Sequence, residues 1–247
     1  MNRPSPVTSV ELENPMKRWL MTMCAALLLA GAASPARAVG PIFDWDPAYF
    51  WSAGATPTNQ PLGGILKAVG TISAFGAPLE FLNATMPATE YTFYIDNLVS
   101  QGTTTLGPPA TQIYTTFYTG GTFVMYQDPS PDAVFAPNPP NVSVPSTFTD
   151  GGAILTGNFT GLLVTTNNFT TFQVGSIEGN IQWTGGSLLS YFSGTDCPGL
   201  FVGGATWRTT PGVGIPGYLF RHDGKIDLQC PTPTAKSTWG RLKSLYR

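Results

Sequence analysis

The sequence predicts an all-β protein, an antiparallel β-sandwich of jelly-roll type over residues 62–230, with an N-terminal signal helix and a short basic C-terminal helical tail. Three observations support this fold class. Apolar and polar residues alternate with period two in several runs, glycine- and proline-rich turns separate these runs, and helical periodicity is almost absent after residue 40. Together they indicate many short strands that each bury one face.

The longest strand pattern is Ala153–Trp183, and it predicts a hairpin that turns at Thr165–Asn168. In its first half, Leu155 and Leu163 are expected on one face. In its second half, the apolar residues move from even to odd positions after Gly175. A strand changes its buried face only by gaining or losing a residue, so we expect a β-bulge near Gly175.

Strands are also expected before this hairpin. They cover residues 65–75, 90–99, 112–118 and 122–127. The last two are predicted to pair as a tight hairpin across Thr119-Gly120-Gly121, because paired glycines allow positive φ. Six prolines in residues 128–149 remove backbone donors, so this segment is expected to be a long loop.

Shorter strands are expected after the hairpin. They cover residues 188–192, 200–207, 218–221 and 225–228, and His222-Asp223-Gly224 is expected to be the last hairpin turn. Residues 39–61 are rich in aromatic side chains, and we interpret them as an entry loop or short helix that seals one end of the sandwich.

The N-terminal 38 residues have the organisation of an upstream extension followed by a secretory signal peptide. A basic segment at Met16–Arg18 precedes an apolar run, and Ala36-Arg37-Ala38 is a small-x-small cleavage site. The mature protein is therefore expected to start at Val39 and to be secreted or placed at the cell surface.

Charge is distributed unevenly along the mature chain. Residues 39–232 carry four basic and twelve acidic side chains, a net charge of −8, whereas residues 233–247 carry four basic side chains and no acid. An acidic domain is poorly suited to nucleic acid, where the domain itself should carry the positive patch, so no nucleic-acid partner is expected.

The basic C-terminal tail, residues 237–247, follows a proline-containing linker at 231–236. On a helix its apolar residues form one stripe, and its basic residues lie largely off that stripe. The apolar residues are Trp239, Leu242 and Tyr246, and the basic ones are Arg241, Lys243 and Arg247. Three interpretations stay open: a contact with sorting machinery or an envelope surface, docking on the acidic domain, and no role.

Cys197 and Cys230 are expected to form a disulfide bond, because export places them in an oxidising compartment. In the chain-entropy model, closing a loop of this length stabilises a domain by on the order of 3–4 kcal/mol. The bond would hold the last hairpin to the sheet where the tail begins.

Catalytic signals are weak. His222 is the only histidine, and no nucleophile elbow is present. A glycoside hydrolase or lyase would need two acids across a cleft, and Asp96 and Glu178 are the strand residues that could supply them. No catalytic residue is therefore assigned.

Two binding sites are considered. Asp128, Asp132 and Asp150 flank the proline-rich loop and are candidate calcium ligands, since Ca²⁺ takes carboxylate and carbonyl oxygens. Without calcium, no cofactor is expected. Four tryptophans could stack on sugars in a carbohydrate-binding module: Trp45, Trp51, Trp183 and Trp207.

Two strings, Tyr118–Asp132 and Phe148–Gly161, resemble segments of the β-rich exported bacterial proteins of the PEP-CTERM type. The Val-Pro-Glu-Pro tag of that group is missing, and residues 238–247 stand in its place. The resemblance implies export and a structural, cell-surface or matrix role without enzyme activity. A carbohydrate-binding module is the alternative function, and a glycoside hydrolase or lyase is a weaker one.

Overall fold

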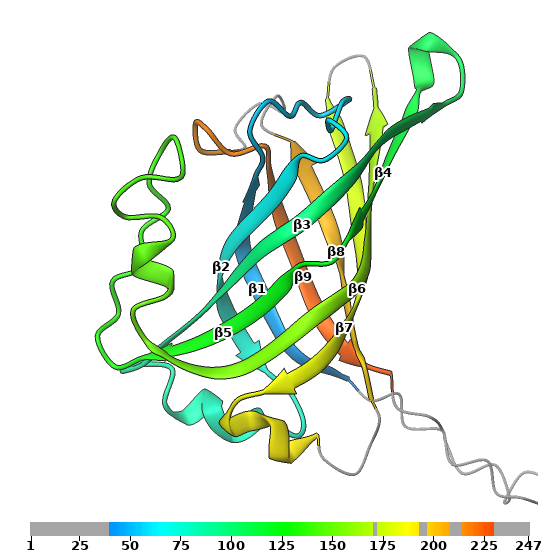
Figure 1. Ribbon diagram of the computed structural model, residues 1–247. Helices are drawn as coiled ribbons and strands as arrows, with labels where there is room; N and C mark the ends of the chain where they lie inside the picture. Colours follow the sequence, from blue (N-terminus) through cyan, green and yellow to red (C-terminus); the bar gives the residue numbers. More distant parts are fainter. Residues whose placement is uncertain (1–39, 170–171, 193–196, 208–213, 230–247) are drawn as a thin grey trace, which may run out of the picture. The chain divides into compact units, whose positions relative to one another are not determined.

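The computed structural model describes residues 40–169, 172–192, 197–207 and 214–229 (Figure 1). The predicted all-β class is confirmed, and the only helices in these residues are short 3-10 turns. The strands are β1 (Pro41–Trp51), β2 (Ile65–Phe75), β3 (Glu90–Leu106), β4 (Ile113–Thr119), β5 (Thr122–Asp128), β6 (Gly152–Asn168), β7 (Gln173–Gly185), β8 (Gly199–Trp207) and β9 (Phe220–Leu228). The 3-10 turns are η1 (Glu80–Ala84), η2 (Pro109–Thr111), η3 (Ser146–Phe148) and η4 (Ser187–Tyr191).

The strands close into an eight-stranded antiparallel barrel, so the predicted jelly-roll sandwich is wrong. Apart from β4 and β5, strands that follow one another along the chain lie side by side, and β1 pairs with both β2 and β9 (Figure 1). The expected entry loop or short helix at residues 39–61 is also wrong, because Pro41–Trp51 form β1, one of the eight strands of the barrel. With β1 in place, the first and last strands pair and the barrel has no open edge.

The predicted hairpin across Thr119-Gly120-Gly121 is also wrong. β4 and β5 pair with the same two neighbours, β3 and β6, so they run end to end and share one position in the barrel. Gly120 and Gly121 have φ of 67° and 96°, and they interrupt this long strand without reversing it. Glycine permits both a tight turn and a bulge at positive φ, and pairing decides between them.

Neighbouring strands change their buried face at the same level as this interruption. In β3, Asn97 has φ of 60° and lies between buried Ile95 and buried Leu98. In β6, the register shifts between Phe159 and Gly161. Beyond that shift Leu163 points outward and is 40% exposed, so it does not share a face with Leu155.

The bulge predicted near Gly175 is therefore wrong, because β6 and β7 pair in register from Gly161 to Asn168. The hairpin itself is confirmed, but Thr165–Asn168 belongs to β6 and the chain turns between Phe169 and Phe172. His222-Asp223-Gly224 lies within β9 and makes no turn. The predicted strand at 188–192 is replaced by η4.

The connections between strands define two ends of the barrel. The upper end, at the top of Figure 1, consists of the described connecting residues 52–64, 107–112, 169, 172 and 214–219. The lower end consists of residues 76–89, 129–151, 186–192 and 197–198. The β3–β4 hairpin extends beyond the barrel wall at the upper end (Figure 1).

Aromatic rings fill the middle of the barrel. Trp45 stacks on Phe201 with ring centroids 4.6 Å apart, and Phe201 stacks on His222 at 5.3 Å and 7°. Phe93 meets the edge of Trp45 at 5.4 Å. All four side chains are fully buried. Close aromatic packing of this kind stabilises a core by more than its buried area alone.

The interior near the upper end is polar instead. Gln60, 3% exposed, enters from the β1–β2 connection, and its Oε1 accepts a hydrogen bond from the Tyr118 hydroxyl at 2.9 Å. Its Nε2 donates to the Thr56 carbonyl at 2.8 Å, and its backbone N–H donates to Thr103 Oγ1 at 2.7 Å. These bonds tie the connection to β3 and β4 and satisfy buried polar groups.

The proline-rich loop, predicted over 128–149 and observed from Pro129 to Gly151, packs against the outside of the barrel. Phe135 and Phe148 contact each other at 4.8 Å, and Phe135 meets Tyr49 of β1 at 5.0 Å. Thr92 Oγ1 on β3 donates to the Phe148 carbonyl at 2.9 Å. A second, smaller core therefore covers the outer face of β1–β3.

Candidate functional site

An acidic cluster lies at the lower end, where the proline-rich loop leaves β5. Carboxylate oxygens of Glu90, Asp128 and Asp132 lie within 4.8 Å of one another. Glu90 Oε2 accepts the backbone N–H groups of Asp132 at 3.1 Å and Ala133 at 2.9 Å. The cluster thus already fixes the first turn of the loop through charge-assisted hydrogen bonds.

Two of the three predicted calcium ligands, Asp128 and Asp132, belong to this cluster. The side chain of Asp132 is exposed, but partial desolvation by its neighbours raises its pKa, and the charges of Asp150 and Asp128 raise it further. Asp150 is thus electrostatically coupled to the cluster without belonging to the group of close carboxylates. Calcium binding stays a prediction.

Glu90 is the residue that the sequence analysis missed. It lies opposite Asp128 in the β3–β5 ladder, and this pairing brings its carboxylate to the loop. An acid at the first position of a strand was the only signal in the sequence. It becomes informative only when the partner strand is known.

The four tryptophans predicted to stack on sugars are all buried. Trp45 and Trp207 are 0% exposed, Trp51 is 5% exposed and Trp183 is 8% exposed. Trp45 lies in the interior and Trp51 belongs to the outer core beneath the proline-rich loop. None of them offers an open ring face for a sugar to stack on.

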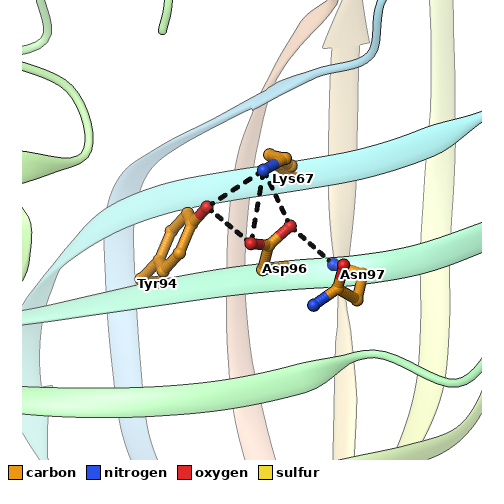
Figure 2. A network of polar contacts seen from close by, with 4 residues as sticks. All are labelled: Lys67, Tyr94, Asp96 and Asn97. Atoms are coloured by element: carbon orange, nitrogen blue, oxygen red, sulfur yellow. Dashed lines mark hydrogen bonds and ion pairs between the residues drawn. The ribbon is translucent and has the colours of Figure 1, made fainter.

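The two strand acids considered for hydrolysis are not brought together. Asp96 lies on β3 and Glu178 on β7, and β6 and the β4/β5 strand separate them in the barrel. Asp96 also has protein partners of its own (Figure 2). Lys67 Nζ lies 3.0 Å from Asp96 Oδ1, and the Tyr94 hydroxyl donates to Asp96 Oδ2 at 3.0 Å.

This Lys67–Tyr94–Asp96 network supports the bulge in β3. Asp96 Oδ1 accepts the backbone N–H of Asn97 at 2.7 Å, at the residue with positive φ (Figure 2). Burial and the hydrogen bond to Asp96 raise the pKa of Tyr94 well above its ordinary value. Tyr94 therefore stays a hydroxyl donor at neutral pH and is unsuited to act as a base.

His222 is a fully buried core residue. Its Nδ1 accepts the Trp45 Nε1–H at 3.0 Å, and within the described part of the chain its Nε2 has no hydrogen-bond partner. Burial lowers its pKa to about 3, against a smaller opposite effect from the backbone of Gly203. The imidazole is therefore neutral and enclosed by aromatic rings.

Cys197 is buried at 4% exposure, just before β8, and Cys230 lies outside the described residues. Their neighbours are close, since the Gln229 N–H donates to the Pro198 carbonyl at 2.9 Å. The disulfide stays a prediction, and intact mass before and after alkylation tests it. The signal peptide and the tail residues from Trp239 to Arg247 also lie outside the described residues.

The upper end carries a different kind of candidate site. Five large apolar side chains are exposed at or next to its connections. They are Leu62 at 76%, Leu106 at 73%, Ile113 at 36%, Phe169 at 45% and Phe172 at 41%. The described connecting residues of this end include no charged side chain. We call these five residues the apolar rim.

A cleft of about 230 Å³ lies beside the apolar rim. It is lined by the β1–β2 connection, including Ser52 and Thr56, and by Gly217–Leu219 before β9. Its lining is uncharged.

Over the described residues, no helix is long and apolar enough to cross a membrane.

Comparison of the chain with protein-family models, curated proteins and solved structures finds no match.

Proposed function

We propose that the chain is an exported, non-enzymatic protein with a structural role at the cell surface, attached to a lipid surface through its upper end. The supporting observation is the apolar rim, five exposed apolar side chains at an end whose described connections are uncharged. Exposed apolar patches larger than those of an ordinary monomer surface mark interaction sites.

The arrangement of the rim favours shallow insertion. Its side chains lie at or next to three separate connections of one end, the β1–β2, β3–β4 and β6–β7 connections (Figure 1). Phe169 and Phe172 contact each other at 4.8 Å, which keeps both rings at the tip of the β6–β7 turn. Apolar side chains at an interface gain about 25 cal/mol for each Å² removed from water.

Because the interior of the barrel is filled by side chains, a partner is expected to bind the outside of the barrel. Trp45, Phe201 and His222 fill the middle of the barrel, and the Gln60 network occupies the upper interior. The groups that meet a partner are then those of the ends and the outer wall. A barrel with a packed interior and exposed apolar side chains at one end is suited to a structural role at a surface.

Vesicle binding tests this proposal. The mature protein should co-sediment with neutral phosphatidylethanolamine–phosphatidylcholine vesicles, and replacing Leu106 and Phe172 together by Gln should lower the bound fraction at least fivefold. Phe81→Gln is the matched control, because Phe81 is 47% exposed and pairs with Tyr191 at 5.0 Å at the opposite end. Equal loss in both variants, or no binding by the parent protein, contradicts the proposal.

Carbohydrate binding is the second candidate, carried by the uncharged cleft with its Ser52 and Thr56 hydroxyls. A glycan array would detect it. Binding that Thr56→Val abolishes and that the rim variant retains would favour this candidate over lipid attachment.

A further inference from the structure

A groove with an acidic rim runs along the outer wall of the barrel. Its volume is about 450 Å³, and β1, β2, β8 and β9 supply its lining. Asp44 of β1 lies opposite Lys225 of β9 in the ladder, and Asp223 borders the same groove. Outward-facing positions of the barrel form this groove, since the intervening inward-facing side chains of Phe43, Trp45 and His222 are fully buried.

Negative charge is in excess in this groove. Lys225 Nζ lies 2.9 Å from Asp227 Oδ2, so the single ammonium group already has a carboxylate partner. Burial raises the pKa of Asp44, Lys225 lowers it, and Asp227 and Asp223 raise it again. Asp227 Oδ1 is buried and has no hydrogen-bond partner among the described residues. Asp44 and Asp223 line the groove and Asp227 contacts its only ammonium group, so the groove and its border carry an excess of negative charge that favours a further cation.

The chain supplies that cation from a segment that follows the groove directly. β9 ends at Leu228, and residues 233–247 carry Lys236, Arg241, Lys243 and Arg247 with no acid. Asp223 lies six residues before Gln229, about 20 Å along a strand. Lys236 lies seven residues after Gln229, and an extended chain of this length spans up to about 24 Å. A chain that folds back at Gln229 can therefore place Lys236 at Asp223.

We propose that the basic C-terminal segment 236–247 docks in the acidic groove of its own barrel. The short connection raises the effective concentration of the segment at the groove to the millimolar range, which favours a contact within one molecule. Each exposed ion pair contributes little, so docking depends on several pairs and weakens in salt.

Zero-length carbodiimide cross-linking of the full mature chain tests docking, because it joins only carboxylates and amines in direct contact. Peptide mapping should find links from Lys236 or Lys243 to Asp44, Asp223 or Asp227. Their yield should fall at least fivefold in 1 M NaCl and in the Asp44→Asn/Asp223→Asn variant. The Lys67–Asp96 pair, at 3.0 Å, reports that the reagent reacts and that the barrel is folded.

The matched control is Asp132→Asn/Asp150→Asn, which removes two charges from the other acidic cluster and should leave the tail links unchanged. Mixing isotopically labelled and unlabelled protein separates links within one molecule from links between molecules. Docking is overturned if the tail links fall on the Asp132 cluster, if they join two molecules, or if they are absent while the Lys67–Asp96 link forms.

Discussion

The upper and lower ends of the barrel close the same eight strands with opposite chemistry. The described connections of the upper end are uncharged and expose Leu62, Leu106 and Phe172, whereas the lower end gathers Glu90, Asp128 and Asp132. The lower carboxylates accept backbone N–H groups and hold a long loop in place. The upper end instead ties its connection from inside, through Gln60. Because the contacts of Gln60 inside the barrel hold the upper connection in place, its apolar side chains can face outward.

The difference continues into the interior, where aromatic rings fill the middle and hydroxyl and amide groups fill the upper part. Both regions are fully buried, but they are stabilised differently. Ring packing contributes through buried area and shape, whereas the polar part contributes only as long as every donor and acceptor is paired. The following tests separate the two contributions.

Trp45→Ala should have the largest effect on stability. It removes a fully buried indole that packs on Phe201 and donates to His222, and such truncations cost about 3–5 kcal/mol. Denaturant unfolding measures the change. A loss below about 1 kcal/mol would mean that the aromatic layer is not the main core.

Lowering the pH should destabilise the protein through His222. Its pKa is about 3 when folded and 6.5 when unfolded, so the unfolded chain binds the extra proton as pH falls from 6.5 toward 3. The contribution of the neutral His222 to the free energy of unfolding is fully present well above pH 6.5. About 2 kcal/mol of it should be lost between pH 7 and pH 5. In His222→Gln this slope should flatten, because glutamine keeps an acceptor for Trp45 and does not titrate. An unchanged slope would assign the loss to other groups.

Gln60→Met should cost about 1–3 kcal/mol, because it leaves the buried Tyr118 hydroxyl without its hydrogen-bond acceptor. Adding Tyr118→Phe should recover part of the loss, since the orphaned hydroxyl is then removed. A thermodynamic cycle over the two variants measures this coupling. Additive losses would show that the upper interior is not a coupled network.

Calcium should produce the smallest effect, a rise of a few degrees in Tm when CaCl₂ is added in excess, with less effect from MgCl₂. Asp132→Asn should abolish this rise while leaving the Tm without calcium nearly unchanged, because Asp132 is exposed. If calcium leaves the parent Tm unchanged, the acidic cluster serves only to hold the loop.

The local pattern of the sequence determined a large part of this fold. Alternation over Glu90–Val99 and Ala153–Trp183 predicted strands at these positions, and the prolines of residues 128–149 predicted a loop. A face change was expected in the second strand of the hairpin, at Gly175, but the structure has it in the first strand, where Leu155 and Leu163 were expected on one face. An extra residue in a strand is recognised only from the partner residues that it faces.

The tertiary structure alone decided that the sheet closes into a barrel and which side chains become neighbours across strands. A strand that buries one face has the same alternation in a sandwich and in a barrel, so the sequence could not tell that β1 and β9 pair. For the same reason it could not bring Glu90 to Asp128 or place His222 beside Trp45, since each pair is joined across strands distant in the chain. The sequence by itself determined which residues favour strands, turns and loops, because those preferences are local. The barrel, its buried tryptophans and its two unlike ends required the register of all eight strands, which is a property of long-range pairing.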